Sequence, residues 1–314
     1  MKIVFFGTSN VALPILETLN KNHQIVAVVT SPDAKTGRKQ VIQESPISVL
    51  AGEMGLKILK PEKVKNNPEI VNELKNLQAD IFIVVSYGYI LPDEIINLPT
   101  NKTLNIHFSL LPKYRGASPI QAAILNNDTE TGSSIFILDD KIDHGTILSQ
   151  EKISIDIDDN FITLGDKLAR MSAKLILKTL DNYQTGKITP IIQNDSEATF
   201  TSIIKKDDGK INWHDSADKI YNQFRAFYPW PGIWTTWEGK KIKILDCKNI
   251  TVVPPELENK ISATSEGLIL EEGYILCGNK TILQIYSLQI EGKNATRFTD
   301  FTNGYKNFIG SKLT

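Results

Sequence analysis

The sequence contains few cysteines and histidines, and their scarcity excludes two kinds of protein. Only two cysteines, Cys247 and Cys277, occur in 314 residues, and neither belongs to a CxxC pair. Two cysteines are too few for a disulfide framework, so we expect a protein of the reducing cytoplasm. The four histidines show no usual zinc-ligand spacing either, and we therefore expect no metal.

Long apolar runs and an excess of charge are also absent. The densest short apolar run, residues 81–85, is far shorter than the roughly 20 residues that cross a bilayer. The apolar start of the chain is broken at Gly7, before it reaches signal-peptide length. Lys and Arg number 35 against 36 Asp and Glu, so the net charge of -1 gives no global attraction to nucleic acid. We expect a soluble monomer in which any RNA contact is a local patch.

Several common catalytic and nucleotide-binding motifs are missing. The sequence has no GxSxG elbow, no GxxxxGK[S/T] loop and no HExxH pair. After the first strand-like run only Gly7 remains of a GxGxxG fingerprint, so a dinucleotide cofactor is not expected. Residues 7–10 instead predict a strand-to-helix turn in which Ser9 or Asn10 caps the helix. We predict a reaction without a covalent intermediate.

Strand-like runs alternate with helical patterns through the first half of the chain. Residues 2–6, 24–30 and 80–85 have the length and composition of strands, and residues 11–19, 46–54 and 162–183 have helical spacing. Runs at residues 103–107 and 133–138 extend the pattern, and a helix is expected to open near Pro119. This alternation predicts an α/β fold whose first domain, residues 1–188, is a Rossmann-like parallel sheet.

The remaining residues predict a linker and a smaller domain. Residues 189–197, TPIIQNDSE, are polar and aperiodic, which predicts a surface linker over residues 189–204. Residues 205–314 contain one helical pattern at 217–227 and short strand-like runs at 234–237, 241–245, 267–270 and 282–288. They predict a small C-terminal OB-like β-barrel, a type that binds nucleic acid, while other barrels and sandwiches stay open.

The stretch TLNIHFSLLPKYRGASPIQ, residues 103–121, contains the strongest candidates for chemistry. Alternate residues of a strand share a face, so Asn105 and His107 are expected to project together at the strand's carboxyl end, where α/β sheets bind ligands. Amide and imidazole groups both donate hydrogen bonds to an oxygen that gains negative charge, and histidine also exchanges protons. Taken alone, a satisfied core histidine and a turn-capping asparagine explain the pair equally well.

The surrounding residues change that balance. The pattern N-x-H-x-S-L-L-P-x-x-R-G-x-x-P-I, followed by D-x-G, resembles the folate-dependent formyltransferases. The resemblance implies catalytic roles for Asn105, His107 and Asp143, and 10-formyltetrahydrofolate as the formyl donor. Phe108 and His144 depart from the family's usual residues, which leaves the shape of the pocket rim open. The implied folate contacts are Ser86, Tyr87, Gly88, Ile90 and Leu91 in one segment and Ser109, Leu110, Leu111 and Pro112 in another.

Asp143 has its own physical rationale. A carboxylate beside a histidine fixes the ring's orientation, and one near an attacking amine can hold the water that carries its proton. Taken alone, however, the residue is more typical of an ordinary loop aspartate in an acidic stretch with Asp139 and Asp140. The resemblance favours the functional interpretation.

The acceptor of the formyl group is indicated by other parts of the chain. Residues 30–40, TSPDAKTGRKQ, resemble the T-x-P-D-x-x-x-G-R loop of the family members that act on methionyl-tRNA, and most of the second half resembles them as well. This implies that Arg38 and Lys39 contact the acceptor end of initiator tRNA, although a solvated basic turn explains these two residues better when they are taken alone. A sugar-nucleotide N-formyltransferase and a non-catalytic tRNA-binding protein remain as alternatives. Further phosphate-contact candidates are Lys205, Lys206, Lys210, Lys240, Lys241, Lys243 and Lys293, whereas Trp230 and Trp234 are expected to pack.

Overall fold

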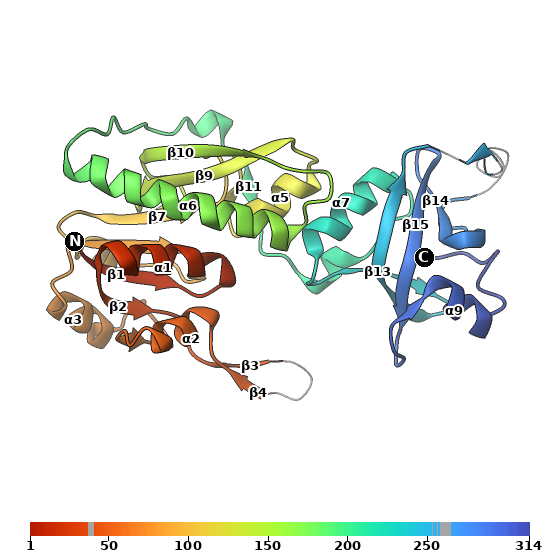
Figure 1. The fold of residues 1–314 in the computed structure, drawn as a ribbon, viewed down its shortest axis with the longest axis horizontal. Coiled ribbons are helices and arrows are strands. Elements are labelled where there is room, and N and C mark those ends of the chain that lie inside the picture. The colour runs from red at the N-terminus through yellow and green to blue at the C-terminus, as the bar shows by residue number, and fades with distance from the viewer. Residues whose placement is uncertain (37–40, 253, 256, 258–264) are drawn as a thin grey trace. The chain divides into compact units, whose positions relative to one another are not determined.

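The structure, a computed structural model, describes residues 1–314 except 37–40, 253, 256 and 258–264. Two of the predicted tRNA-binding residues, Arg38 and Lys39, therefore lie outside the described residues. The chain divides into two compact units (Figure 1). Unit 1 comprises Met1–Ile120, Thr129–Ile155 and Thr163–Ile203, and unit 2 comprises Gln121–Asp128, Asp156–Ile162 and Ile204–Thr314.

Unit 1 is built on a seven-stranded sheet in the order β10-β9-β7-β6-β1-β2-β5. Strands β5, β2, β1, β6 and β7 are parallel neighbours, which confirms the predicted Rossmann-like α/β fold. Strand β9 runs antiparallel to both of its neighbours, β7 and β10, a direction that the local apolar pattern does not encode. The strands are β1 (Lys2–Gly7), β2 (Gln24–Val29), β5 (Ile58–Leu59), β6 (Ile81–Val85), β7 (Thr103–His107), β9 (Glu130–Ile137) and β10 (Ile147–Ser154).

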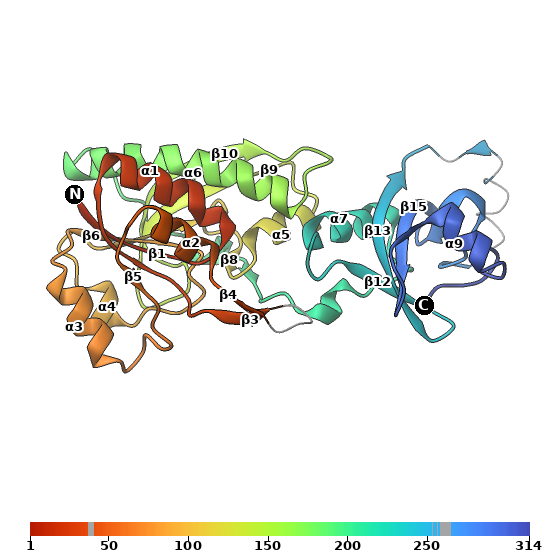
Figure 2. The same ribbon diagram turned by 60° about the horizontal axis from the view of Figure 1, so that its bottom comes forward.

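Helices cover both faces of this sheet. Helices α1 and α6 lie on one face, and α3 and α4 lie on the other (Figure 2). Ser45 and Asn67 start α2 and α3, since each side chain accepts a hydrogen bond from the first turn, and a proline follows each cap. The helices are α1 (Leu13–Asn22), α2 (Pro46–Glu53), α3 (Pro68–Asn76), α4 (Asp93–Ile96), α5 (Pro119–Leu125) and α6 (Phe161–Gln184).

Strand β1 explains why the first apolar run is continuous rather than alternating. Residues 3–6 are all fully buried because helices cover both faces of the sheet around β1. Val4 and Phe6 share one core cluster with Ile70 of α3 and Ile95 of α4. The core thus fixes β1 between β2 and β6. It also fixes the carboxyl end of the sheet, where β1, β6 and β7 end.

The turn after β1 differs from the prediction. Ser9 precedes a 3-10 turn, η1 (Asn10–Ala12), but its side chain forms no helix cap. Its Oγ donates instead to Ser86 Oγ at 2.7 Å, across the edge where β1 and β6 end side by side. The predicted cap was therefore wrong, because a polar partner from the neighbouring strand competes for the hydroxyl.

Unit 2 contains an antiparallel sheet in the order β12-β13-β15-β14, with β16 paired to β15. Helix α7 packs on β13 and β15. Residues 267–270 form isolated bridges rather than the predicted strand, and the strand lies at β14 instead. The elements are α7 (Ala217–Phe227), β12 (Ile233–Trp237), β13 (Lys240–Ile250), β14 (Tyr274–Cys277), β15 (Thr281–Ile290), β16 (Thr296–Arg297) and α9 (Phe298–Gly304).

Candidate active site

Three predicted residues meet at the carboxyl end of β7. Asn105 and His107 lie on the same face of this strand, as expected from its period of two. Asn105 Nδ2 donates to Asp143 Oδ1 at 3.3 Å, and His107 Nδ1 lies 3.5 Å from Asp143 Oδ2. All three side chains are buried or half-buried. Two potential donors and one carboxylate therefore converge on one point, while their catalytic roles remain predictions.

The ring orientation of His107 is fixed by a backbone contact. His107 Nε2 lies 2.8 Å from the carbonyl oxygen of Tyr114. A carbonyl oxygen only accepts hydrogen bonds, so Nε2 must carry a proton. The nitrogen that remains for a reactant is Nδ1, beside Asp143. It follows that His107 donates to an oxyanion from Nδ1 only as an imidazolium, and that neutral His107 offers a proton acceptor there.

Asp143 is held in a constrained backbone conformation. Its φ is 46°, in the left-handed region that aspartate tolerates better than most residues. The backbone N–H of Gly116 donates to Asp143 Oδ2 at 2.7 Å. A Cβ at Gly145, two residues later, would lie 1.7 Å from the carbonyl oxygen of Ile137. Glycine is therefore required at 145 for space.

The loop after β7 is held in place by hydrogen bonds of buried serine side chains. Ser109 is fully buried, and its Oγ donates to the carbonyl oxygen of Lys113 at 2.6 Å. Ser134 Oγ accepts from the backbone N–H of Leu111 and donates to the carbonyl oxygen of Ser109. Leu111 packs with Phe136 in a small apolar cluster. Of the predicted folate contacts in this loop, Leu110 and Pro112 are the partly exposed ones.

The other predicted folate segment follows β6. Ser86 has a φ of 48° and Gly88 a φ of 85°, and the space that a Cβ would take at Gly88 is open. Ile90 is 79% exposed, whereas Tyr87 and Leu91 are buried. Since β6 and β7 pair in parallel register, this segment begins next to the Asn105 and His107 end of β7. The exposed apolar side chain of Ile90 and the open backbone at Gly88 therefore lie near the carboxyl end of the sheet.

The two departures from the family pattern have different surroundings. Phe108 is buried, so its side chain belongs to the interior. His144 is partly exposed and lies between two carboxylates: its Nδ1 is 2.6 Å from Asp139 Oδ2, and its Nε2 is 3.5 Å from Asp195 Oδ2. Asp195 also accepts from Arg115 Nη2 at 2.8 Å, and this hydrogen bond holds the pKa of Asp195 below its ordinary value.

Sequence reasoning did not identify two residues, Gln193 and Arg115, that support the turn containing Asp143. Gln193 and Arg115 are both buried next to the 143–145 turn, although they are distant from Asp143 along the chain. Residues 200–201 form β11 (Phe200–Thr201), which pairs with β8 (Arg115–Gly116). The predicted surface linker thus includes a segment bonded to the loop after β7. No short-range pattern indicates such contacts, although the presence of Arg115 and Gly116 in the family-like stretch was a signal.

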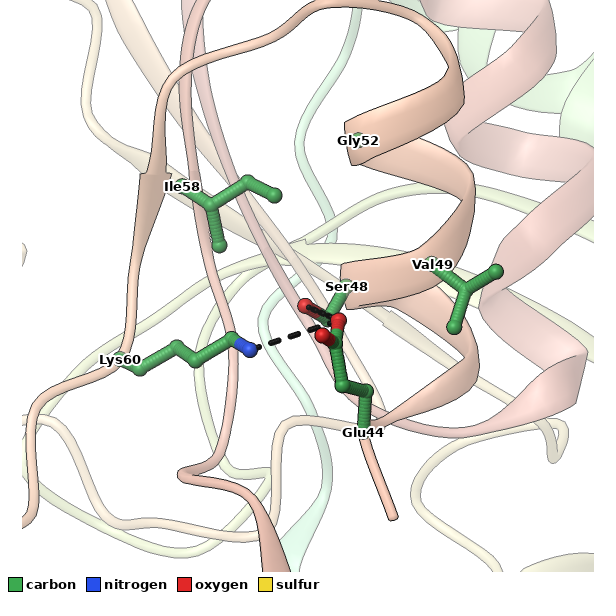
Figure 3. Close-up of a pocket in the computed structure, with 6 residues that line it drawn as sticks. All are labelled: Glu44, Ser48, Val49, Gly52, Ile58 and Lys60. Carbon is green, nitrogen blue, oxygen red and sulfur yellow. Dashed lines mark hydrogen bonds and ion pairs between the residues drawn. The ribbon is translucent and has the colours of Figure 1, made fainter.

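A pocket elsewhere in unit 1 contains none of the predicted site residues. It lies between α2 and β5 and is lined by Glu44, Ser48, Val49, Gly52, Ile58 and Lys60. Figure 3 shows Lys60 and Ser48 directed at the Glu44 carboxylate, and Lys60 also pairs with Asp33 at 2.6 Å. Its charges are thus satisfied by one another.

Two further kinds of feature, metal sites and membrane-spanning helices, can be assessed over the described residues. In the part of the chain that the structure describes, no three His, Cys, Asp or Glu side chains form a group that could hold a metal ion. Among the same residues, no helix combines the length and apolar character needed to cross a membrane.

Unit 2 carries a basic cluster around an aromatic ring, which we name the Trp234 patch and define as Trp234, Lys206, Lys210, Lys241 and Lys243. Lys241 Nζ lies 3.3 Å from the centroid of the Trp234 ring, and Lys210 Nζ lies 6.0 Å from it. The pKa of Lys241 is lowered, mainly by desolvation and to a smaller extent by repulsion from Lys206 and Lys243. Trp230 is 60% exposed, so its predicted packing role is wrong.

Comparisons with known proteins agree along the whole chain. A family model described as formyl transferase matches residues 1–180, and one described as formyl transferase, C-terminal domain, matches residues 203–306. The methionyl-tRNA formyltransferase of Caldanaerobacter subterraneus subsp. tengcongensis is 40% identical over 306 residues, 97% of each chain. The protein of the same name from Sulfurihydrogenibium sp. is 38% identical over 318 residues, 100% of each chain.

A solved structure adds evidence on the fold. WlaRD, a sugar 3N-formyl transferase crystallised in the presence of dTDP and 5-N-formyl-THF, matches with a TM-score of 0.67 and 22% identity. The match covers 94% of this chain and 99% of WlaRD. At that identity the likeness shows the shared fold alone. The family matches and the high-coverage relatives together confirm the resemblance, and the chain belongs to the formyltransferase family, among the methionyl-tRNA formyltransferases.

Proposed function

We propose that the protein transfers the formyl group of 10-formyltetrahydrofolate to the free amino group of methionyl initiator tRNA, giving N-formylmethionyl-tRNA for translation initiation. The observation that carries the proposal is the meeting of Asn105, His107 and Asp143 at the carboxyl end of β7. Relatives with 40% identity over nearly the full length are named methionyl-tRNA formyltransferases, which supports this acceptor.

The three side chains divide the work of acyl transfer. Asn105 Nδ2 and, when protonated, His107 Nδ1 donate hydrogen bonds to the formyl oxygen, which gains negative charge as the amine attacks. The Asp143 carboxylate lies 3.5 Å from His107 Nδ1, close enough to orient the ring. The same carboxylate accepts the proton that the attacking amine loses, directly or through one water, and returns it toward the leaving folate nitrogen. All of this proceeds without a covalent bond to the protein.

The formyl donor is proposed to bind along the two turned segments beside this trio. Ile90 and Leu110 supply apolar surface for a flat heterocycle, and the backbone around Gly88 can approach it because no Cβ intervenes. Backbone N–H and C=O groups of the segment around Gly88 supply the polar contacts to the folate. A folate donor is also supported by WlaRD, which shares this fold and was crystallised in the presence of 5-N-formyl-THF.

The Trp234 patch is proposed to contact the tRNA backbone. Four lysines around one ring form a local basic surface in a chain with a net charge of only -1. Lysine neutralises phosphate charge without a demand for precise geometry, and a partly exposed indole can stack on a base. Of the lysines suggested by the sequence, Lys206, Lys210, Lys241 and Lys243 gather here. We also keep Arg38 and Lys39 as proposed contacts.

The protein is proposed to work in the reducing cytoplasm. Cys247 and Cys277 are both buried and free, as cytoplasmic thiols usually are. Burial raises the pKa of Cys277 to about 12, so its thiol stays protonated and unreactive at neutral pH.

The decisive experiment follows a labelled formyl group from 10-formyltetrahydrofolate. Charged methionyl initiator tRNA, the same tRNA without methionine, and a dTDP-linked amino sugar are offered separately as acceptors. We expect label only on the charged tRNA. Label on the amino sugar alone would overturn the acceptor, and absence of label from every acceptor, with folded protein and measured folate binding, would overturn the activity.

A further inference from the structure

Gln193 makes two hydrogen bonds to the turn that carries Asp143. Its Nε2 donates to the carbonyl oxygen of Asp143 at 2.9 Å and to that of Gly145 at 2.8 Å. The side chain is 8% exposed, so little water competes for these two carbonyl groups. One amide thus holds both ends of a three-residue turn from a segment 50 residues further along the chain.

The orientation of this amide is fixed by a buried cation. Gln193 Oε1 accepts from Arg115 Nε at 3.0 Å and from Arg115 Nη2 at 2.9 Å. A guanidinium group only donates and carbonyl oxygens only accept, so the amide oxygen must face Arg115 and the nitrogen must face the turn. Arg115 itself is 3% exposed, and its backbone N–H donates to the carbonyl oxygen of Thr199 at 2.8 Å. A chain of hydrogen bonds therefore runs from the predicted linker to Asp143.

The turn needs this support for a physical reason. An aspartate at a φ of 46° is in a sparsely populated conformation, which persists only where the surroundings impose it. The carboxylate is shared by Asn105, His107 and the N–H of Gly116, at distances between 2.7 and 3.5 Å. If the backbone relaxed toward a negative φ, the carboxylate would leave all three partners together.

We propose that Gln193 is a positioning residue that holds the Asp143 carboxylate in register with Asn105 and His107. The inference rests on the proposed function, because it assigns Asp143 its proton-transfer role. Gln193 itself touches no reactant. Its effect is exerted through the backbone of residues 143–145, and Arg115 acts one step further back by fixing the amide.

The variant Gln193→Glu separates positioning from mere filling of space. Glutamate has nearly the same shape and still offers an oxygen to Arg115, so that contact is kept and gains charge. It has no N–H to give, and it places a carboxylate oxygen against two carbonyl oxygens. The matched control is Gln284→Glu in unit 2, because Gln284 Nε2 also donates to a carbonyl oxygen, that of Glu272, while its Oε1 accepts from Tyr286 Oη.

We expect Gln193→Glu to lower kcat by about 10- to 100-fold, since a displacement of about 1 Å near the reacting groups can cost about 100-fold. The KM for the folate donor should change less than about threefold, because the proposed folate segments are not bonded to Gln193. Gln284→Glu should leave both constants near those of the parent. If Gln193→Glu does not fold, Gln193→Asn replaces it, because asparagine keeps the amide but is one methylene too short to span Arg115 and the turn.

A double variant supplies the readout that a purely structural role would not move. In an Asp143→Asn background the carboxylate to be positioned is gone, so adding Gln193→Glu should lower kcat by less than about twofold. Near-parental kcat in the single variant would overturn the proposal. So would an undiminished second loss of kcat in the Asp143→Asn background, because it would show an effect unrelated to Asp143.

Hydrogen exchange makes this test independent of activity. Backbone amides of residues 138–146 should exchange at least about tenfold faster in Gln193→Glu than in the parent, while those of β6 and β7 stay unchanged. Unaltered exchange at residues 138–146 would overturn the proposal. The parent's transfer rate, measured first, tests the proposed function separately, so a failure of that function and a failure of the Gln193 inference are told apart.

Discussion

The site at the end of β7 and the Trp234 patch use opposite kinds of chemistry. Around Asp143, polar groups are buried, and the carboxylate has three partners from different positions along unit 1. In the Trp234 patch, several lysines surround one ring, and Lys206, Lys210 and Lys243 are exposed. The first arrangement fixes positions, and the second supplies charge.

This difference teaches where single substitutions should matter. Buried, directional contacts fail together when one member is removed, because the remaining groups lose both their partner and their geometry. Exposed cations act nearly independently through a screened field, so the loss of one is a fraction of the whole. We therefore expect large effects on kcat from the β7 site and small, salt-dependent effects on KM from the Trp234 patch.

The largest effect is expected at the trio itself. Asn105→Ala or His107→Ala should lower kcat by about 100-fold or more, as removal of one oxyanion donor typically does. The two variants are measured in steady-state assays of formyl transfer, with Gln284→Glu as a folded control. Turnover near the parental rate in either variant would remove that residue from the proposed mechanism and weaken the contrast between the two regions.

The next effect tests the packing of the Asp143 turn. Gly145→Ala places a methyl group 1.7 Å from the carbonyl oxygen of Ile137, so the turn must move to relieve the overlap. We expect kcat to fall about 10-fold or more and the free energy of unfolding to fall by about 1 to 3 kcal/mol. Activity and the urea midpoint are measured on the same protein.

The control for that variant is Gly52→Ala in the last turn of α2. A Cβ at Gly52 meets its nearest atom, Ile58 Cδ1, at 4.0 Å, so alanine fits there. Because alanine favours helix over glycine, the midpoint should rise by the equivalent of up to about 1 kcal/mol. An equal loss of activity in both variants would mean that the 143–145 turn has no special demand for space.

The same contrast shows which features could be predicted from sequence. The bounds of α7 at residues 217–227, and of α6 within a residue or so of the expected 162–183, followed from apolar spacing alone. The shared face of Asn105 and His107 followed from the period of a strand. Such features depend on neighbours within a few residues, and local pattern encodes them.

Other features depend on partners far along the chain. The antiparallel direction of β9, the hydrogen bond from Ser9 to Ser86, and the Gln193 contacts with the Asp143 turn are visible only in the tertiary structure. Residues 189–204 were predicted to be a surface linker because they are polar and aperiodic. Most of these residues are exposed, and what their composition does not show is that the buried side chain of Gln193 and the short strand β11 bond to the loops of the site.

A smaller effect is expected from the Trp234 patch. Lys241→Ala should raise the KM for methionyl-tRNA about three- to tenfold, leave kcat unchanged, and reduce the slope of log KM against log salt by about one. The control is Lys219→Ala, an exposed lysine of α7 that pairs with Asp215. A fall in kcat instead of a rise in KM would show that the patch is part of the chemistry, and the division between position-fixing and charge-supplying regions would fail.

The smallest effect concerns pH and involves Asp195, an exposed residue that is bonded to a buried one. Asp195 is exposed, but the hydrogen bond from buried Arg115 lowers its pKa below the ordinary value of 3.8. A group whose pKa is lower in the folded state stabilises the fold above its unfolded pKa, and that contribution is lost as pH falls through the folded value. Asp195→Asn should therefore be slightly less stable than the parent above about pH 5.

The difference should shrink in more acidic solution and vanish once Asp195 is protonated in the folded parent. Urea midpoints measured from about pH 7 to about pH 2 test this, with formyl transfer at neutral pH as a second readout. Because Gln193 still holds the turn when Asp195 is replaced, activity should stay within about twofold of the parent. A stability difference that grows toward low pH would contradict the sign derived from the Arg115 contact, and a large loss of activity would place Asp195 with the buried, position-fixing groups rather than with the screened charges of the surface.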